Sequence, residues 1–165
     1  DLISGIYVLD DNKLINPFSD LPAIDGTKPT LIHKYSKNYY DIQYLRSLTE
    51  ETTEMDITVL YKISSFEPLI ATKILDLGRR AIVRGVYDDD NYIYLMRDEL
   101  INNNEVFTVK KLKKSDYSIV AETSVPDSQN FITYMKNGGI WILNNSERGT
   151  VYRIDCNDLS VMVVR

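Results

Sequence analysis

A short hydrophobic phrase that recurs along the chain constrains the fold more than any other feature. It begins with isoleucine, and its copies stand at 6–9, 42–45, 93–96 and 140–143. A second phrase consists of Lys or Arg, then Ile or Leu, four turn-forming residues and a further hydrophobic run. Its copies begin at Lys62, Lys111 and Arg153 and align without a gap. Two phrases that keep their order at a spacing of roughly 40–50 residues indicate a repeat protein.

Each repeat unit is predicted to contain four strands. The clearest unit has expected strands at 81–87, 92–100, 105–112 and 117–125, with a tight turn at 88–91 and a longer loop at 101–104. Asp, Asn, Gly and Ser clusters separate these runs, and such residues favour hairpins because they tolerate left-handed backbone or bond their own backbone. The 12 tyrosines and the many Ile and Val residues suit a pleated surface. The sequence therefore predicts an all-β fold of antiparallel four-stranded units.

These units resemble the blades of the β-propeller superfamily over essentially the whole chain. The sequence has no GH…WD pair of the WD40 type, and its Gly138-Gly139 pair precedes a strand, whereas a kelch-type double glycine follows one. The resemblance therefore implies an architecture and says little about activity. We expect one propeller-like domain over 1–165, either a small ring or part of a larger propeller. Its repeat units, the first of them incomplete, are expected at roughly 1–29, 30–78, 79–126 and 127–165.

Residues 47–55 allow two interpretations. Ser47 and Glu50 fit a capping box, which would start a short helix, whereas the flanking strands favour a long charged hairpin loop. The open edges of blade-like sheets are prone to aggregate unless they are paired. We therefore expect a protein partner or an additional propeller-forming chain.

Charge and hydropathy exclude several classes of function. The formal net charge is -5, and the one dense basic run, at 109–116, would alternate faces on a strand, so nucleic-acid binding is not expected. No apolar run approaches the roughly 20 residues that span a bilayer, so no membrane span is expected. The N-terminus is not an intact signal peptide, although a cleaved one would leave no trace. The compartment is left open between a secreted or cell-envelope location and the cytoplasm.

Aromatic residues and the single histidine are the candidate ligand-binding groups. Trp141 and its expected counterparts Tyr94, Tyr7 and Tyr44 hold a recurring position, which suits packing between units or, if exposed, sugar stacking or a protein hot spot. His33 is the one histidine, so any His-based mechanism would have to use it. Its alternative is a plain strand residue. Cys156 is the only cysteine, which excludes an intrachain disulfide, and we expect it to be partly exposed.

An acidic cluster supplies the candidate metal ligands. Asp88, Asp89 and Asp90 could coordinate Ca²⁺, the one cofactor considered, because Ca²⁺ binds six to eight oxygens. Asp residues are also ordinary turn formers, and their spacing does not match a calcium-binding EF-hand loop.

No catalytic residue is assigned, because no serine lies in a GxSxG motif and a Ser-His-Asp site would have to use His33. The first hypothesis is therefore a non-catalytic module that binds a protein or ligand. The alternatives are a carbohydrate-active or calcium-dependent propeller enzyme, with Asp41, Asp88 and Asp90 as carboxylates, and a structural segment of a larger surface or viral protein.

Overall fold

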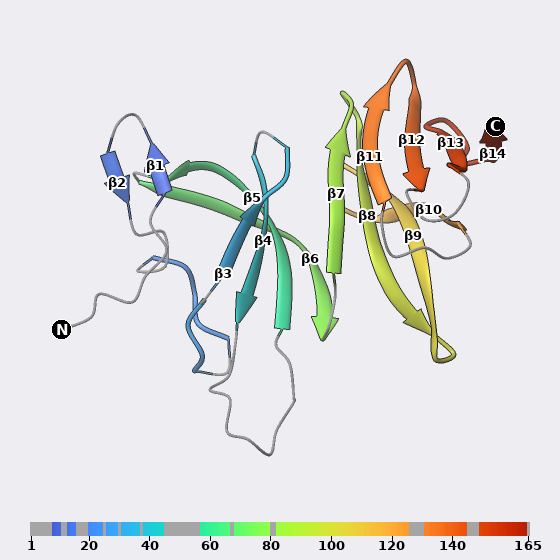
Figure 1. The fold of residues 1–165 in the computed structure, drawn as a ribbon. Helices are drawn as coiled ribbons and strands as arrows, with labels where there is room; N and C mark the ends of the chain where they lie inside the picture. Colours follow the sequence, from blue (N-terminus) through green and yellow to red (C-terminus); the bar gives the residue numbers. More distant parts are fainter. Residues whose placement is uncertain are drawn as a thin grey trace. The chain divides into compact units, whose positions relative to one another are not determined.

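A computed structural model describes 8–10, 13–15, 20–24, 26–29, 31–36, 38–44, 57–66, 68–79, 82–125, 131–144 and 149–164. Within these ranges the chain is all-β and contains no helix, as predicted (Figure 1). The strands form one hairpin and three antiparallel four-stranded sheets. The described residues include no helix long and apolar enough to cross a membrane. The expected helix or loop at 47–55 lies outside the described residues.

The chain divides into two compact units, residues 1–81 and 82–165. The first unit contains the hairpin of β1 (Val8–Asp10) and β2 (Lys13–Ile15) and a sheet in which the strands pair in chain order. The strands of this first sheet are β3 (Leu31–Lys34), β4 (Tyr39–Tyr44), β5 (Ile57–Phe66) and β6 (Leu69–Arg79).

One face of the first sheet carries the core of its unit. Tyr40, Ile42 and Val59 are buried there together with Leu21, which comes from the segment before β3. The Tyr44 hydroxyl donates to the carbonyl of Pro22 at 3.1 Å in the same segment. Apolar packing and this hydrogen bond thus hold the segment against the sheet, which removes the apolar face from water.

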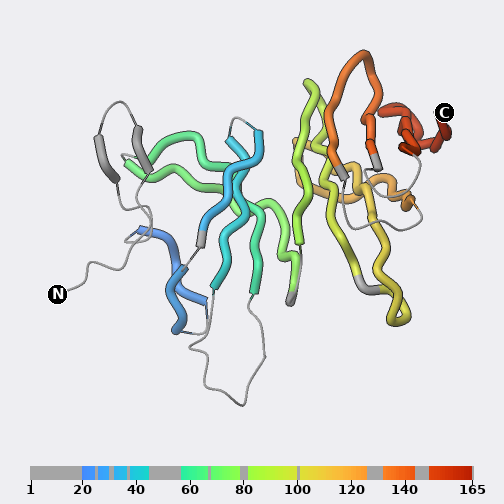
Figure 2. Tube along the Cα trace, in the orientation of Figure 1, coloured from blue at the N-terminus to red at the C-terminus, as the bar shows by residue number. Residues whose placement is uncertain are grey.

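The second unit consists of two further sheets, each again a four-stranded meander (Figure 2). The second sheet has strands β7 (Ile82–Asp88), β8 (Tyr92–Ile101), β9 (Asn104–Lys113) and β10 (Ile119–Val125). The third sheet has strands β11 (Phe131–Lys136), β12 (Gly139–Asn144), β13 (Val151–Asp155) and β14 (Val161–Val164).

The second and third sheets share one hydrophobic core. Tyr94, Met96 and Val109 of the second sheet belong to the same buried cluster as Ile140 and Ile142 of the third. At the first strands of the two sheets, the Tyr87 hydroxyl donates to the carbonyl of Thr133. The two sheets therefore pack face to face, and the arrangement is consistent with blade-like repeats. A closed propeller ring is not established by these three sheets.

The last turns of the second and third sheets are built alike. Tyr117 and Leu159 occupy the same place and both have a φ of 59°. Their amides donate to carbonyls four residues earlier, at 2.9 and 2.8 Å. In each turn an aspartate side chain also accepts a hydrogen bond from a backbone amide: Asp116 from the amide of Ser118, and Asp158 from the amide of Ser160. The gapless alignment of the second phrase is thus reproduced in backbone geometry.

The first sheet departs from this pattern, and its last turn contains Pro68. The proline ring fixes φ near −65°, so Pro68 cannot adopt the positive φ of Tyr117 and Leu159. In this sheet β5 continues to Phe66, which pairs with Leu69.

Two details of the predicted strand alignment are wrong. The backbone hydrogen bonds at the hairpin tips align Asn38 with Asn91 and Gly138, so Tyr40, not Ile42, is the counterpart of Ile93. The loop expected at 101–104 is a two-residue turn of Asn102 and Asn103, with φ of 51° and 63°. Two consecutive positive φ values close a tight hairpin, and Asn accepts them more readily than most residues.

Candidate interaction surface

The interface between the second and third sheets shows how one face of a repeat is covered. Tyr94 lies on β8 in this interface and is 1% exposed. Its hydroxyl lies 2.7 Å from Asp89 Oδ2 and 3.1 Å from the carbonyl oxygen of Cys156 in the third sheet. The Tyr94 ring is therefore part of the packing between repeats, and it is not available as a ligand platform.

A buried lysine binds the turn of the covering sheet. Lys111 Nζ donates to the carbonyls of Cys156 at 2.7 Å and of Asn157 at 2.9 Å. The same ammonium lies 4.1 Å from the centre of the Tyr92 ring. The turn carbonyls and the ring face compensate the cost of burying the charge.

The third sheet presents a second row of the same kind on its other face. The register aligns four residues across β11–β14: Tyr134, Trp141, Arg153 and Met162. Tyr134 and Trp141 are stacked, with ring centroids 6.1 Å apart and planes 6° from parallel. Arg153 Cζ lies 5.9 Å from the Trp141 ring, and Arg153 Nη1 lies 3.4 Å from Asp155 Oδ2.

Alternate residues of β12 have different environments, whereas on the edge strand β14 Val161 and Val163 are exposed although they share the face of Ile154. Ile140, Ile142 and Ile154 are fully buried against the second sheet. Side chains alternate between the faces of a strand, so the intervening residues point the other way. We call them the outer face: Ile132, Tyr134, Lys136, Gly139, Trp141, Leu143, Val151, Arg153, Asp155, Met162 and Val164.

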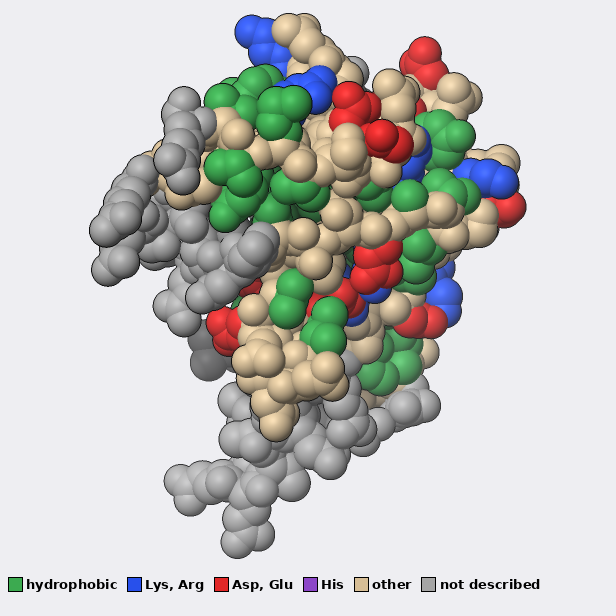
Figure 3. Space-filling view, turned by 90° about the vertical axis from the view of Figure 1, so that its right-hand side faces the viewer, with side chains coloured by type: hydrophobic (Ala, Val, Ile, Leu, Met, Phe, Trp, Pro, Cys, Tyr) green, Lys and Arg blue, Asp and Glu red, His purple; other side chains and the backbone are tan. Residues whose placement is uncertain are grey.

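The outer face is largely apolar and partly open to solvent. Ile132, Tyr134 and Met162 are 60%, 42% and 58% exposed. In a view from the right-hand side of Figure 1, hydrophobic side chains gather at several places on the surface (Figure 3). Clustered apolar exposure marks interaction sites, and Trp, Tyr, Met and Arg are enriched in protein interfaces.

The covered row and the open row occupy the same place in their repeats. The hairpin-tip hydrogen bonds align Asn91 with Gly138 and therefore Tyr94 with Trp141. Through the strand register, the counterparts of the row Tyr134, Trp141, Arg153 and Met162 are Tyr87, Tyr94, Lys111 and Ala121. One row lies under a neighbouring sheet, and the other lies on the partly exposed outer face.

The aromatic residues predicted as ligand-binding candidates therefore have different environments. Trp141 lies on the outer face, Tyr94 is buried between sheets, and Tyr7 lies outside the described residues. Sequence reasoning missed Tyr134 and Arg153, which pack around Trp141. Their signal was present as the residues opposite Trp141 on both neighbouring strands.

His33 forms a separate polar cluster in the first unit. Its Nδ1 lies 3.0 Å from Asp41 Oδ1, and the Tyr35 hydroxyl donates to Asp41 Oδ2 at 3.0 Å. Asp41 is buried, whereas the imidazole is half exposed. A carboxylate on Nδ1 fixes the orientation of the ring. The three described side chains of this cluster include no serine or cysteine nucleophile, which a hydrolytic triad would need.

The three candidate metal ligands have different environments. Asp88 pairs with Lys114 at 2.7 Å. Asp89 Oδ1 accepts hydrogen bonds from the amides of Asn91 and Tyr92, whereas Asp90 is exposed. Burial raises the pKa of the Asp89 carboxyl, but the hydrogen bonds from Tyr94 and the two amides outweigh it and lower that pKa. Among the described residues no three His, Cys, Asp or Glu side chains are grouped to hold a metal ion, and calcium binding stays a prediction.

Cys156 is buried, contrary to the expected partial exposure, because its turn packs into the core between the second and third sheets. Burial raises the pKa of its thiol, which disfavours the reactive thiolate.

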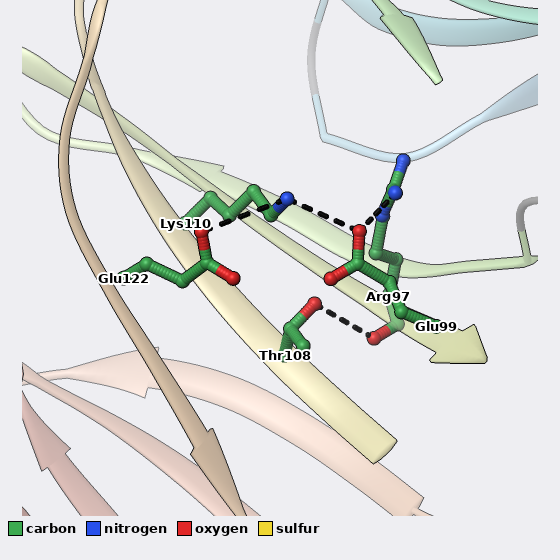
Figure 4. Close-up of polar contacts among 5 residues, drawn as sticks. All are labelled: Arg97, Glu99, Thr108, Lys110 and Glu122. Atoms are coloured by element: carbon green, nitrogen blue, oxygen red, sulfur yellow. Dashed lines mark hydrogen bonds and ion pairs between the residues drawn. The ribbon is translucent and has the colours of Figure 1, made fainter. Parts of the chain in front are cut away.

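A charged network lies across the second sheet, on the face turned away from Tyr94 (Figure 4). Glu99 pairs with Arg97 and, at 3.1 Å, with Lys110 Nζ. Lys110 also lies 3.7 Å from Glu122 on β10. Burial raises the pKa of Glu99, but the Lys110 hydrogen bond and the Arg97 charge outweigh it and lower that pKa.

No family model, curated protein or solved structure matches this chain. The functional argument therefore rests on its own repeats and surfaces.

Proposed function

We propose that the chain is a non-catalytic interaction module that binds a protein partner, or a further propeller-forming chain, through the outer face of β11–β14. One observation carries this proposal: Tyr134 and Met162 of the row are exposed and Trp141 and Arg153 are partly exposed, whereas the counterpart row in the second sheet is covered by a neighbouring sheet. The equivalent positions in the second sheet, Tyr87, Tyr94 and Lys111, thus already serve as a packing surface within the chain.

The chemistry of the outer face supports binding. The parallel Tyr134 and Trp141 rings hold each other in place, so little side-chain freedom remains to be lost when a partner binds. Arg153 adds a planar group of hydrogen-bond donors beside the rings. Aromatic and Arg side chains at the centre of a packed surface contribute most to binding energy at protein interfaces.

The enzymatic alternative has weaker support. Asp41 is buried and bonded to His33 and Tyr35 in the first unit, and Asp88 is paired with Lys114 in the second. A glycosidase needs two carboxylates that flank one bond and can act as acid and base. No described observation favours such a pair here.

Site-specific photo-crosslinking tests the proposed surface. A photoreactive amino acid at Met162 should form a covalent adduct with one discrete partner in the native host. The same group at Ile119, an exposed apolar residue on the edge strand of the second sheet, should not form this adduct. Tyr134→Asp should reduce the adduct by about tenfold or more, since loss of a central aromatic at a binding hot spot costs about 2 kcal/mol or more. No adduct at 162, or the same adduct from 119, would contradict the proposal.

A further inference from the structure

We infer that the partner on the outer face is a four-stranded antiparallel sheet of the same repeat type, and that Arg153 binds the carbonyls of its last turn. This inference rests on the proposed function, because it names the partner of the same surface. It is drawn from the contacts that the third sheet makes with the second, where an equivalent face is already covered.

The covering sheet in this interface has a defined chemistry. It contributes Ile140, Ile142 and Ile154 from its two central strands, and Leu159 from the turn between β13 and β14. These side chains pack against Tyr94 and its neighbours. The corresponding partner of Trp141 is therefore a flat face of branched aliphatic residues.

The turn of the covering sheet is bound through its backbone. Lys111 Nζ donates to two successive carbonyls of this turn, at 2.7 and 2.9 Å. Arg153 is the counterpart of Lys111 in the third sheet. Its guanidinium has five donors in a fixed plane and can reach two carbonyls at once, and backbone carbonyls require no particular side chains in the partner.

Gly139 keeps Arg153 in the corresponding position. A Cβ on Gly139 would lie 2.8 Å from Nε and 3.0 Å from Cζ of Arg153, so the guanidinium lies directly on the glycine backbone. The counterpart of Gly139 in the second sheet is Tyr92, over which Lys111 lies. In each of the two sheets the cation thus lies over the first residue of the second strand, Tyr92 in β8 or Gly139 in β12. Arg153 therefore occupies the position that Lys111 has when it binds the turn of the neighbouring sheet.

A second copy of this chain does not offer the required face. The residues that correspond to the aliphatic face are buried in every described sheet. They are Tyr40, Ile42 and Tyr61 in the first sheet, Ile93, Leu95 and Leu112 in the second, and Ile140, Ile142 and Ile154 in the third. The occupant is therefore a sheet other than the three described.

An extended chain provides the test. A second copy of residues 125–165 is appended after Arg165, which preserves the repeat spacing because Ser124 is the counterpart of Arg165. The added copy supplies the same aliphatic face and turn that already cover Tyr94, and its own tryptophan is changed to phenylalanine so that Trp141 is the only indole. We expect a blue shift of Trp141 emission and loss of acrylamide quenching relative to the unextended chain.

Variants of Arg153 test the turn contact. In the extended chain, Arg153→Met should lower the folding equilibrium constant roughly tenfold or more, because charge-assisted hydrogen bonds contribute on that scale. The same change should have a much smaller effect in the unextended chain. Arg153→Lys should retain most of the stability, as Lys111 forms the equivalent contact. Equal effects of Arg153→Met in both chains would refute the role of Arg153.

Unchanged quenching of Trp141 in the extended chain would overturn the inference, whether or not the added residues gain β-structure. Its failure is distinguishable from that of the proposed function. A discrete crosslinked partner at 162 together with unchanged quenching would retain the interaction surface and reject the sheet-type partner. If no partner crosslinks at 162 and the quenching of Trp141 is also unchanged, both the interaction surface and the sheet-type partner are rejected.

Discussion

Lys111 illustrates how a single residue joins two repeats of this chain. Its ammonium is buried between the second and third sheets and donates to two backbone carbonyls of one turn. Removing one partner of a buried hydrogen bond leaves the other without compensation for its lost water. The carbonyl of Cys156 would still have the Tyr94 hydroxyl nearby, and Asn157 lies at an exposed position.

We expect Lys111→Met to destabilise the chain by about 1.5–3 kcal/mol, the usual contribution of hydrogen bonds to a charged group. Met has a similar length and keeps the packing on Tyr92. Lys113→Met is the matched control, because Lys113 is exposed on the same strand, and it should change stability by no more than about 0.5 kcal/mol. Urea unfolding followed by Trp141 fluorescence measures both. Equal effects of the two changes would mean that the buried contacts add nothing.

The roles of individual residues were only partly predictable from the sequence. The repeat placed Lys111 and Arg153 at equivalent positions, and likewise Tyr94 and Trp141. It could not show that a neighbouring sheet covers one row while the other stays partly exposed, because coverage depends on what packs there and not on strand alternation. Trp141 and Tyr94 are thus equivalent in position, and the choice between packing and ligand binding, which the sequence left open, differs between their environments.

At the scale of elements, turn chemistry determined where the prediction succeeded. Strands of the second sheet were predicted to within a few residues, because Asp, Asn and Ser clusters bound each hydrophobic run. The first sheet was misaligned because β5 continues to Phe66, beyond the point at which its counterparts β9 and β13 end. The phrase that begins at Lys62 therefore matches the other two in sequence, but the turn that it forms has a different geometry.

The network around Glu99 links three neighbouring strands and predicts a pH dependence. The pKa of Glu99 is lowered in the folded chain, so its ionised form favours folding. This contribution is complete above the usual carboxyl pKa of about 4.3 and is lost as the pH falls through the lower folded pKa. Acid should therefore weaken the joint between β8, β9 and β10.

We expect Glu99→Gln to cost about 1–3 kcal/mol at neutral pH, because Lys110 and Arg97 lose a charged acceptor. The variant should also lose less stability than the unmodified chain between about pH 7 and pH 3. Glu105→Gln, at an exposed position at the start of β9, serves as the control. Denaturant midpoints over this pH range measure the difference. A pH profile unchanged by Glu99→Gln would show that the network does not set acid stability.

At the scale of the whole molecule, three similar sheets are distributed over two compact units, and each unit has its own described core. The all-β class and the three four-stranded sheets followed from repeated strand and turn patterns. The number of repeats needed to close a ring did not follow, because ring closure depends on how successive sheets pack and not on the pattern within one sheet. The division into units at 1–29, 30–78, 79–126 and 127–165 stays a prediction.

The mass of the chain in solution tests whether the outer face is used between identical copies. Each described sheet already has its aliphatic face buried, so two copies cannot repeat the packing seen between the second and third sheets. The net charge of -5 also opposes self-association at neutral pH. We therefore expect light scattering on a sizing column to give a monomer of 19.0 kDa, with the same mass for Met162→Glu. A discrete dimer that Met162→Glu dissociates would show that a second copy occupies the outer face. Arg153 would then act at a self-interface, and the sheet-type partner would have to be abandoned.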